Sequence, residues 1–462
     1  MKYIPHSRHA SLLLSGLEEI AHKHGVESSL SDTVIGDAVS HVQKLEDDPE
    51  SEYETENGKI STLFYLWIQA IDQGDTEKAK KLEEQIDQSV EDHPFPYAET
   101  KEFYKYSTSQ GYPQEASYDY ALTNYRDCEK APWKDQKNFG MIEGTVSAGA
   151  KIGIIGDWGT GTDDAAFLLE ELLTRVPDVE AILHLGDIYQ CGTPFECAQN
   201  FMDPINDIFE KMGIARVPVL TIPGNHEYYT GAKGYFELLE LLNSDLDSKW
   251  KQEASYFCLR SEDGKWQFLG ADTGLGCINH QTEPGLEPSE FAWHQKRLGE
   301  FDGKSIFMTH HQFMSAEQAL NDHGEGDLQY FNKRLLAGLG DNLSEIDLWI
   351  WGHDHWFLPY VSGIEIPGTN GAQVLNHGQL LGGSARETEV KKRNADNIIY
   401  KGVVAQKDGQ YILPGSHGGL TNHTYGIFDL SASTVSYYEV GAWEGTTPNK
   451  TAPKDPLYVV NL

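Results

Sequence analysis

The sequence has no long apolar run and no recognisable leader. None of its apolar runs approaches the roughly 18 residues that a membrane helix requires. Its 39% hydrophobic and 23% charged residues are typical of a globular protein that folds in water. The apolar patch Leu12–Leu14 precedes Glu18 and Glu19 without a small-residue cleavage site, so we expect no signal peptide. These absences argue against a membrane protein and favour a cytoplasmic location.

Cysteine is also scarce. The five cysteines are odd in number and irregularly spaced, which fits reduced thiols better than a disulfide framework. Cys191 and Cys197 follow Asp187 closely, and a ligand role can be considered for them. Thiolates suit closed zinc sites, whereas the other candidate ligands are carboxylates and imidazoles. Cysteine ligation is therefore the less favoured interpretation.

Basic residues are few compared with acidic ones. There are 36 Lys and Arg against 71 Asp and Glu, a net charge of −35. Such a surface repels nucleic-acid phosphates, and the one short basic run, Lys391–Arg393, does not offset it. It also repels small anionic substrates at long range, so bound metal ions would have to supply the local attraction. The spacings of Rossmann and Walker nucleotide loops are both absent.

The length of 462 residues predicts two domains, or one large domain with an extension. Residues 1–145 contain apolar residues at helical spacing and predict a helical N-terminal domain for packing, a lid function or oligomerisation. Glycines interrupt the pattern over residues 137–150 and predict a linker. Residues 146–462 alternate short β-rich runs with helices, which predicts an α/β domain. Within it, residues 425–440 predict a hairpin that closes the sheet, and residues 384–401 a charged mobile loop.

Five short segments end β-rich runs in residues that bind metals. Any one alone is weak evidence, but all five occur in order, each after a predicted strand. Carboxyl ends of strands are where α/β sheets build their sites. The mixture of oxygen and imidazole donors suits two adjacent divalent metal ions. The segments are Gly156–Gly159, Gly186–Tyr189, Gly224–Glu227, Thr309–His311 and Gly352–His355.

These five segments resemble the signature of the calcineurin-like metallophosphoesterase superfamily, and Gly156–Gly159 looks most like its purple acid phosphatase branch. The resemblance covers roughly residues 150–440 and does not extend to the N-terminal third. It implies a four-layer αββα metallophosphoesterase sandwich with a two-metal site along one edge. The expected fold class is therefore α/β, with an all-helical N-terminal domain added.

The resemblance also implies a division of the ligands. Asp187 would be the carboxylate that bridges the two ions, which need an anionic bridge to offset their repulsion. Asp157 and His355 would bind the first ion, and the second would take Asn225, His310 and His353. The glycine that precedes four of these ligands would let the backbone turn sharply and approach the ions without a Cβ clash.

Two departures from the family pattern lie around the first ion. Many members carry a histidine two residues after the first aspartate, where this chain has Gly159. Purple acid phosphatases compensate with a tyrosine three residues after the second aspartate, but Gln190 stands there and Tyr189 comes one residue earlier. If Tyr189 binds, an iron(III)–tyrosinate and a purple colour follow. Otherwise manganese, iron(II) or zinc is expected.

The resemblance makes His226 the residue that stabilises the transition state or donates a proton to the leaving group, a task that imidazole suits. His311 and His323 are candidates for substrate binding. The predicted function is hydrolysis of phosphoric monoesters or diesters by a metal-bridging hydroxide, with a small phosphate ester as substrate and no prediction of the oligomeric state. The alternative is a non-catalytic, metal-retaining scaffold or sensor that binds a partner through its helical domain.

Overall fold

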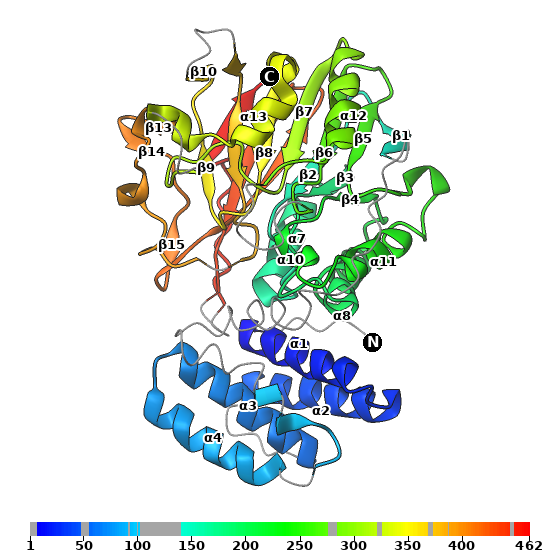
Figure 1. Cartoon of the computed structure of the whole chain (residues 1–462), viewed down its shortest axis with the longest axis vertical. Coiled ribbons are helices and arrows are strands. Elements are labelled where there is room, and N and C mark those ends of the chain that lie inside the picture. The colour runs from blue at the N-terminus through cyan, green and yellow to red at the C-terminus, as the bar shows by residue number, and fades with distance from the viewer. Residues whose placement is uncertain are drawn as a thin grey trace. The chain divides into compact units, whose positions relative to one another are not determined.

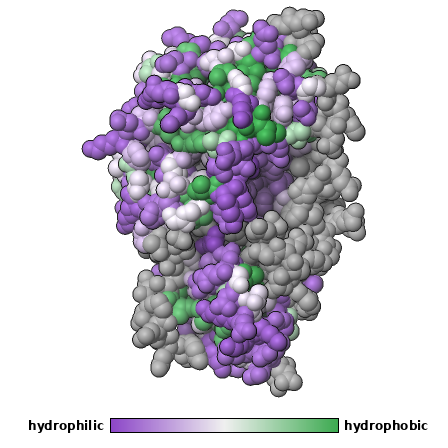
Figure 2. Space-filling view, turned by 90° about the vertical axis from the view of Figure 1, so that its left-hand side faces the viewer, coloured by the Kyte–Doolittle hydropathy of each residue, from purple (hydrophilic) through white to green (hydrophobic). Residues whose placement is uncertain are grey.

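The computed structural model describes residues 7–47, 55–90, 93–98, 100–101, 140–275, 284–320, 326–367, 373–386, 388–443 and 448–462. The chain divides into two compact units. One comprises Ile4–Glu129 with Gly161–Asp163, and the other Met1–Tyr3, Lys130–Thr160 and Asp164–Leu462. Across the described residues, no helix has the length and apolar character needed to cross a membrane. On the face drawn in Figure 2, hydrophilic residues cover much of the described surface, with smaller hydrophobic groups between them.

The first unit is helical, as the apolar spacing predicts (Figure 1). Side chains three and four residues apart are buried along its helices, for example Leu13, Leu17 and Ile20 in the first of them. Asp75 accepts a hydrogen bond from the backbone N–H of Lys78 at 3.0 Å and so caps the fourth helix. The helices are α1 (Arg8–Lys23), α2 (Ser28–Asp47), α3 (Glu56–Asp72) and α4 (Thr76–Val90).

The second unit contains two large β-sheets in its described part. The order of the six-stranded sheet is β19-β18-β17-β2-β3-β4, in which β2, β3 and β4 run parallel. The order of the seven-stranded sheet is β1-β5-β6-β7-β8-β12-β9, in which β6, β7, β8 and β12 run parallel. The bounds of the first sheet are β2 (Lys151–Ile155), β3 (Val179–His184), β4 (Val219–Thr221), β17 (His423–Asp429), β18 (Thr434–Val440) and β19 (Tyr458–Asn461). Those of the second are β1 (Met141–Val146), β5 (Phe257–Ser261), β6 (Trp266–Ala271), β7 (Lys304–Thr309), β8 (Leu348–Trp351), β9 (Phe357–Pro359) and β12 (Gly378–Leu381).

Three apolar clusters show that this unit has four layers. One cluster holds Ile154, Leu183, Phe268 and Ile350, so it lies between the two sheets. A second packs α7 and α9 against the outer face of the six-stranded sheet, and a third packs α12 and α13 against the seven-stranded sheet. The helices of this unit are α7 (Asp163–Arg175), α8 (Pro194–Cys197), α9 (Asp203–Met212), α10 (Asn225–Tyr228), α11 (Lys233–Leu241), α12 (Pro288–Gly299) and α13 (Lys333–Leu339). The predicted αββα sandwich with a helical N-terminal region is confirmed.

Two local predictions differ from the structure. Strand β1 lies within residues 137–150, where glycines suggested a linker. Gly140 and Gly144 instead make room for the rings of Tyr256 and Trp250, which a Cβ at either position would approach within 3 Å. The predicted hairpin exists as β17 and β18, but it does not close the sheet, because β17 also pairs with β2 and β19 forms the edge. Shorter strand pairs are β10 (Ile364–Glu365) with β11 (Val374–Leu375), β13 (Gln406–Lys407) with β14 (Gln410–Tyr411), and β15 (Ser416–His417) with β16 (Leu420–Thr421).

Candidate metal centre

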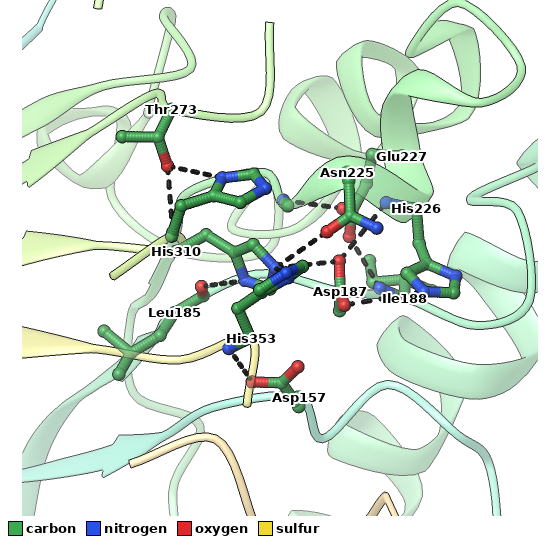
Figure 3. Close-up of polar contacts among 12 residues, drawn as sticks. Asp157, Leu185, Asp187, Ile188, Asn225, His226, Glu227, Thr273, His310 and His353 are labelled. Atoms are coloured by element: carbon green, nitrogen blue, oxygen red, sulfur yellow. Dashed lines mark hydrogen bonds and ion pairs between the residues drawn. The ribbon is translucent and has the colours of Figure 1, made fainter. Parts of the chain in front are cut away.

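The five segments lie at the carboxyl ends of parallel strands in the two sheets. Asp157, Asp187 and Asn225 follow β2, β3 and β4 of the six-stranded sheet. His310 and His353 follow β7 and β8 of the seven-stranded sheet. Because the sheets face each other, these strand ends meet, and Figure 3 shows their side chains converging on one place. Each sheet therefore supplies part of the ligand set.

One group of polar atoms surrounds the hydroxyl of Tyr189. This hydroxyl donates to Asp157 Oδ1 at 3.0 Å and lies 3.2 Å from Asp187 Oδ2 and 3.0 Å from His355 Nε2. His355 Nε2 is 3.6 Å from Asp157 Oδ1. At Gln190, by contrast, the backbone N–H donates to Glu196, and the carbonyl accepts from the ring of His226. The tyrosine of the shortened turn thus lies among the residues expected around the first ion.

A second group surrounds Nε2 of His310. This nitrogen lies 3.1 Å from Asn225 Oδ1, 3.1 Å from His353 Nδ1 and 3.3 Å from Asp187 Oδ1. The other ring nitrogen, Nδ1, donates to the carbonyl of Leu185 at 3.0 Å. That hydrogen bond selects the tautomer whose Nε2 lone pair points at the group, an arrangement common in metal-binding histidines.

The backbone at the strand ends brings the ligands close together. Asp157, Asp187 and His353 themselves have positive φ angles of 57°, 70° and 73°, a region that non-glycine residues adopt mainly at functional sites. The preceding glycines serve mainly to avoid clashes. A Cβ on Gly224 would lie 2.0 Å from Asp187 Oδ1, and one on Gly352 would lie 2.6 Å from Asp157 Oδ2. The sharp turn expected at the glycines therefore occurs in part at the ligands.

The electrostatics of this group suit a cation. Asp157 and Asp187 are both fully buried, and burial together with the charge of Asp187 raises the pKa of Asp157 well above its usual range. Two buried carboxylates whose oxygens lie within 4.8 Å of each other ionise together only when a positive charge lies beside them. Burial also lowers the pKa of His310 to about 4, so its ring is neutral at pH 7 and can act as a donor. Carboxylate, amide, phenol and imidazole donors together fit iron, manganese or zinc.

The ligand atoms of two groups of described residues lie within 4.8 Å of one another and could hold an ion. These groups are Asp157, Asp187 and His310, and His310, His311 and His353. Neither group includes Cys191 or Cys197, which are buried free thiols. The preference for oxygen and nitrogen donors over thiolates therefore agrees with the geometry.

His226 lies beside the bridging candidate. Its backbone N–H donates to Asp187 Oδ1 at 3.2 Å, and its Nε2 lies 3.7 Å from Asp187 Oδ2. Its Nδ1 faces the carbonyl of Gln190, which orients the ring, and the side chain keeps 14% exposure. Burial lowers the pKa of His226. A histidine held at the edge of the group can reach a substrate that binds there.

The two predicted substrate-binding histidines have different outcomes. The ring of His311 is buried and lies 4.6 Å from the ring of His353, centroid to centroid. The hydroxyl of Thr273 is 3.0 Å from both its backbone nitrogen and its Nδ1, so Thr273 orients it. His323 lies outside the described residues.

Sequence reasoning assigned no role to Glu227, the last residue of the third segment. Its buried carboxylate accepts hydrogen bonds from Ile188 N at 2.6 Å and Gly224 N at 2.7 Å (Figure 3). It therefore connects the turn that carries Asp187 to the turn that carries Asn225. The sequence signal that could have identified this role is the position of Glu227, three residues after Gly224, where an acidic side chain can accept from the Gly224 backbone N–H. Trp158, in the first segment, is fully buried and packs on Phe201, so it is not available to stack on a substrate.

Part of the second unit matches a known protein family. Residues 150–357 match the family model described as calcineurin-like phosphoesterase. Among curated proteins no match was found. Three solved structures are similar to the chain in fold. The GAP50 anchor of the inner membrane complex of Plasmodium is 16% identical, with a TM-score of 0.40 over 66% of this chain and 90% of that one.

The other two are phosphatases by title. A purple acid phosphatase from yellow lupin (Lupinus luteus) seeds is 13% identical, with a TM-score of 0.36 over 70% of this chain and 55% of that one. A dimetal phosphatase from Danio rerio is 14% identical, with a TM-score of 0.39 over 66% of this chain and 98% of that one. The match of residues 150–357 agrees with the αββα layers of the second unit. The chain therefore contains a calcineurin-like phosphoesterase domain, which the family model matches over residues 150–357.

Proposed function

We propose that the domain predicted over residues 146–462 is a dinuclear-metal hydrolase of small phosphoric esters. The observation that carries the proposal is the position of Asp187, whose two oxygens face different donor groups. Oδ1 lies 3.3 Å from His310 Nε2, and Oδ2 lies 3.2 Å from the hydroxyl of Tyr189. A carboxylate so placed can bridge two ions.

The proposed ligand sets follow the two groups of atoms. Asp157, Tyr189 and His355 would bind the first ion, and Asn225, His310 and His353 the second. The contacts of 3.0–3.2 Å around the Tyr189 hydroxyl support its inclusion. Burial and nearby Asp157 raise the pKa of Tyr189, so only a bound cation would make it a phenolate. The ions would be iron, manganese or zinc, and iron(III) on Tyr189 would give a visible absorption band.

The protein's own residues would then act on the ester. Bound ions of this kind supply an activated water nucleophile and polarise the phosphoryl oxygens. His226, once protonated, keeps its Nδ1–H on the Gln190 carbonyl, and its Nε2–H is the proton that the leaving oxygen receives. Glu227 holds the Asp187 and Asn225 turns at a constant spacing, and His311 lines the pocket beside His353.

The substrate would be a small molecule. The net charge of −35 repels the phosphates of long nucleic acids. Bound metal ions would offset this repulsion for a small ester at the site. A cytoplasmic location and the roles of the helical domain stay predictions from the sequence.

The test is hydrolysis of p-nitrophenyl phosphate and bis-p-nitrophenyl phosphate after reconstitution with Mn²⁺, Zn²⁺ or Fe ions. Asp187→Asn should lose at least about 100-fold in kcat/KM, because one charged bridge is replaced by a neutral group. Asp302→Asn, at an exposed carboxylate, is the matched control and should equal wild type. Hydrolysis of neither ester with any metal, or full activity of Asp187→Asn, would overturn the proposal. Metal binding without hydrolysis would favour the scaffold alternative.

A further inference from the structure

Arg386 lies beside the first ligand group, although the sequence places it in a charged stretch after β12. The segment before it is held against the turn of Asp157. Ser384, fully buried, donates from its backbone N–H to the Gly156 carbonyl at 3.0 Å, and its hydroxyl accepts from Gly156 N at 2.9 Å. The Ser384 hydroxyl also donates to the Thr424 carbonyl at 2.7 Å. On the other side, the Thr388 hydroxyl donates to the His355 carbonyl at 2.8 Å, so hydrogen bonds on both sides of Arg386 hold its segment in place.

The guanidinium of Arg386 faces the candidate metal centre. Its Cζ lies 4.9 Å from the centroid of the Tyr189 ring, whose hydroxyl contacts Asp157 and His355. Its positive charge also contributes to the lowered pKa values of His355 and His226, after the larger effect of burial. The ring contact puts one cation beside Tyr189, a proposed ligand of the first ion.

Among the described residues, none uses the hydrogen-bond donors of Arg386. None of the described residues forms an ion pair or hydrogen bond with its guanidinium, although acidic residues outnumber basic ones by 71 to 36. Arg393, in the same charged stretch, differs. It contacts Glu317 at 2.8 Å and Asp354 at 3.4 Å, so it has carboxylate partners on both sides. A half-buried guanidinium that keeps its fork of donors available is suited to an anionic ligand.

We propose that Arg386 binds the phosphoryl group of the substrate and makes the site selective for phosphomonoesters. This inference rests on the proposed function and specifies its substrate class. A guanidinium binds two oxygens of one phosphate in a bidentate manner, and the bond strengthens with the charge on the oxygens. The terminal phosphate of a monoester has three unesterified oxygens and about two negative charges. A diester has two such oxygens and a single charge, so it gains less from Arg386.

The test compares Arg386→Ala, Arg386→Lys and wild type in the metal-loaded full-length protein. For p-nitrophenyl phosphate, Arg386→Ala should raise KM about 10- to 100-fold, the range expected for a hydrogen bond to a charged group. For bis-p-nitrophenyl phosphate, Arg386→Ala should lower kcat/KM less than about fivefold, because the single charge of a diester makes a weaker hydrogen bond. Arg386→Lys should lie between, because an ammonium keeps the charge but not the fork. Lys392→Ala removes a charge from the same stretch, at an exposed side chain, and should behave as wild type.

A second measurement does not depend on turnover. Inorganic phosphate, titrated calorimetrically into the metal-loaded proteins, should bind about 10- to 100-fold more weakly to Arg386→Ala than to wild type. The proposal is overturned if Arg386→Ala binds phosphate as tightly as wild type. It is also overturned if the substitution lowers kcat/KM equally for the two esters. Arg386 would then only pack on Tyr189. If wild type hydrolyses neither ester, the proposed function fails. A weaker phosphate affinity of Arg386→Ala would in that case still support the anion site.

Discussion

Gly224 lies against Asp187 and His310 of the candidate centre. Replacing it with alanine is expected to weaken metal binding directly. A Cβ at this position would lie 2.0 Å from Asp187 Oδ1 and 2.8 Å from His310 Cε1. Non-bonded carbon and oxygen atoms do not approach closer than about 3 Å, so one of the groups must move by roughly 1 Å. Asp187 is fully buried and also accepts from His226 N at 3.2 Å, so its shift would break existing contacts.

The magnitude follows from these distances. Overpacking of this kind costs about 1–3 kcal/mol of stability. Displacement of a group that orients metal ligands weakens metal affinity about 10- to 100-fold. A misplacement of about 1 Å in the centre costs a further factor of about 100 in turnover. Gly224→Ala should therefore stay folded but bind metal poorly.

The measurement is isothermal titration of Mn²⁺ or Zn²⁺ into chelator-treated protein, combined with urea unfolding of the metal-free form. Gly299→Ala is the matched control, because a Cβ at the end of α12 meets nothing within 4 Å. It should bind metal like wild type and change stability by no more than about 1 kcal/mol. A folded Gly224→Ala with wild-type metal affinity would refute the reasoning that the glycine is needed for close approach to Asp187.

Three further predictions test other parts of the molecule. Tyr189→Phe should bind the first ion more weakly in calorimetric titration, and its iron form should lack the tyrosinate absorption band that wild type shows. Thr273→Val removes the hydroxyl that lies 3.0 Å from His311 Nδ1. It should raise KM for p-nitrophenyl phosphate about fivefold, the effect of one hydrogen bond. An unchanged KM would show that His311 does not contribute to substrate binding. Burial lowers the pKa of His294 from 6.5 to about 3, so its contribution to stability is present above pH 6.5 and is lost as the pH falls toward 3. Urea unfolding of metal-free His294→Gln between pH 4 and 6 should therefore show a pH slope flatter by up to about 1.4 kcal/mol per unit, and a slope equal to wild type would contradict the assignment.

The candidate ligands at the strand ends, which stay a prediction, could be located from the sequence because both of their signals are local. Each ligand follows a short apolar run, and the preceding glycine marks a turn, so order and spacing identify the segments without knowledge of the fold. The helices of the first unit could be predicted for the same reason, from apolar residues three and four apart. The hairpin β17–β18 was also recognised, but its place between β2 and β19 depends on pairings over long sequence distances.

The residues that sequence reasoning missed act through distant partners. Thr273 follows β6 and contacts His311 after β7, and Glu227 contacts Ile188 39 residues earlier. Arg386 lies 197 positions after Tyr189 (386 − 189), and no periodicity connects them. Whether Tyr189 would reach the ligand group could not be predicted, because spacing in a turn does not specify the direction of a side chain.

The sequence by itself determined the chemistry available to this protein: the ligand types, their order and their attachment to strand ends, since each depends on residues a few positions apart. Only the tertiary structure decided how these residues are combined. It brings Asp187 between two donor groups, directs Tyr189 rather than Gln190 at one of them, and places the charge of Arg386 over the Tyr189 ring. The physical reason is that these relations arise from packing two sheets face to face, which sets distances between residues far apart in the chain.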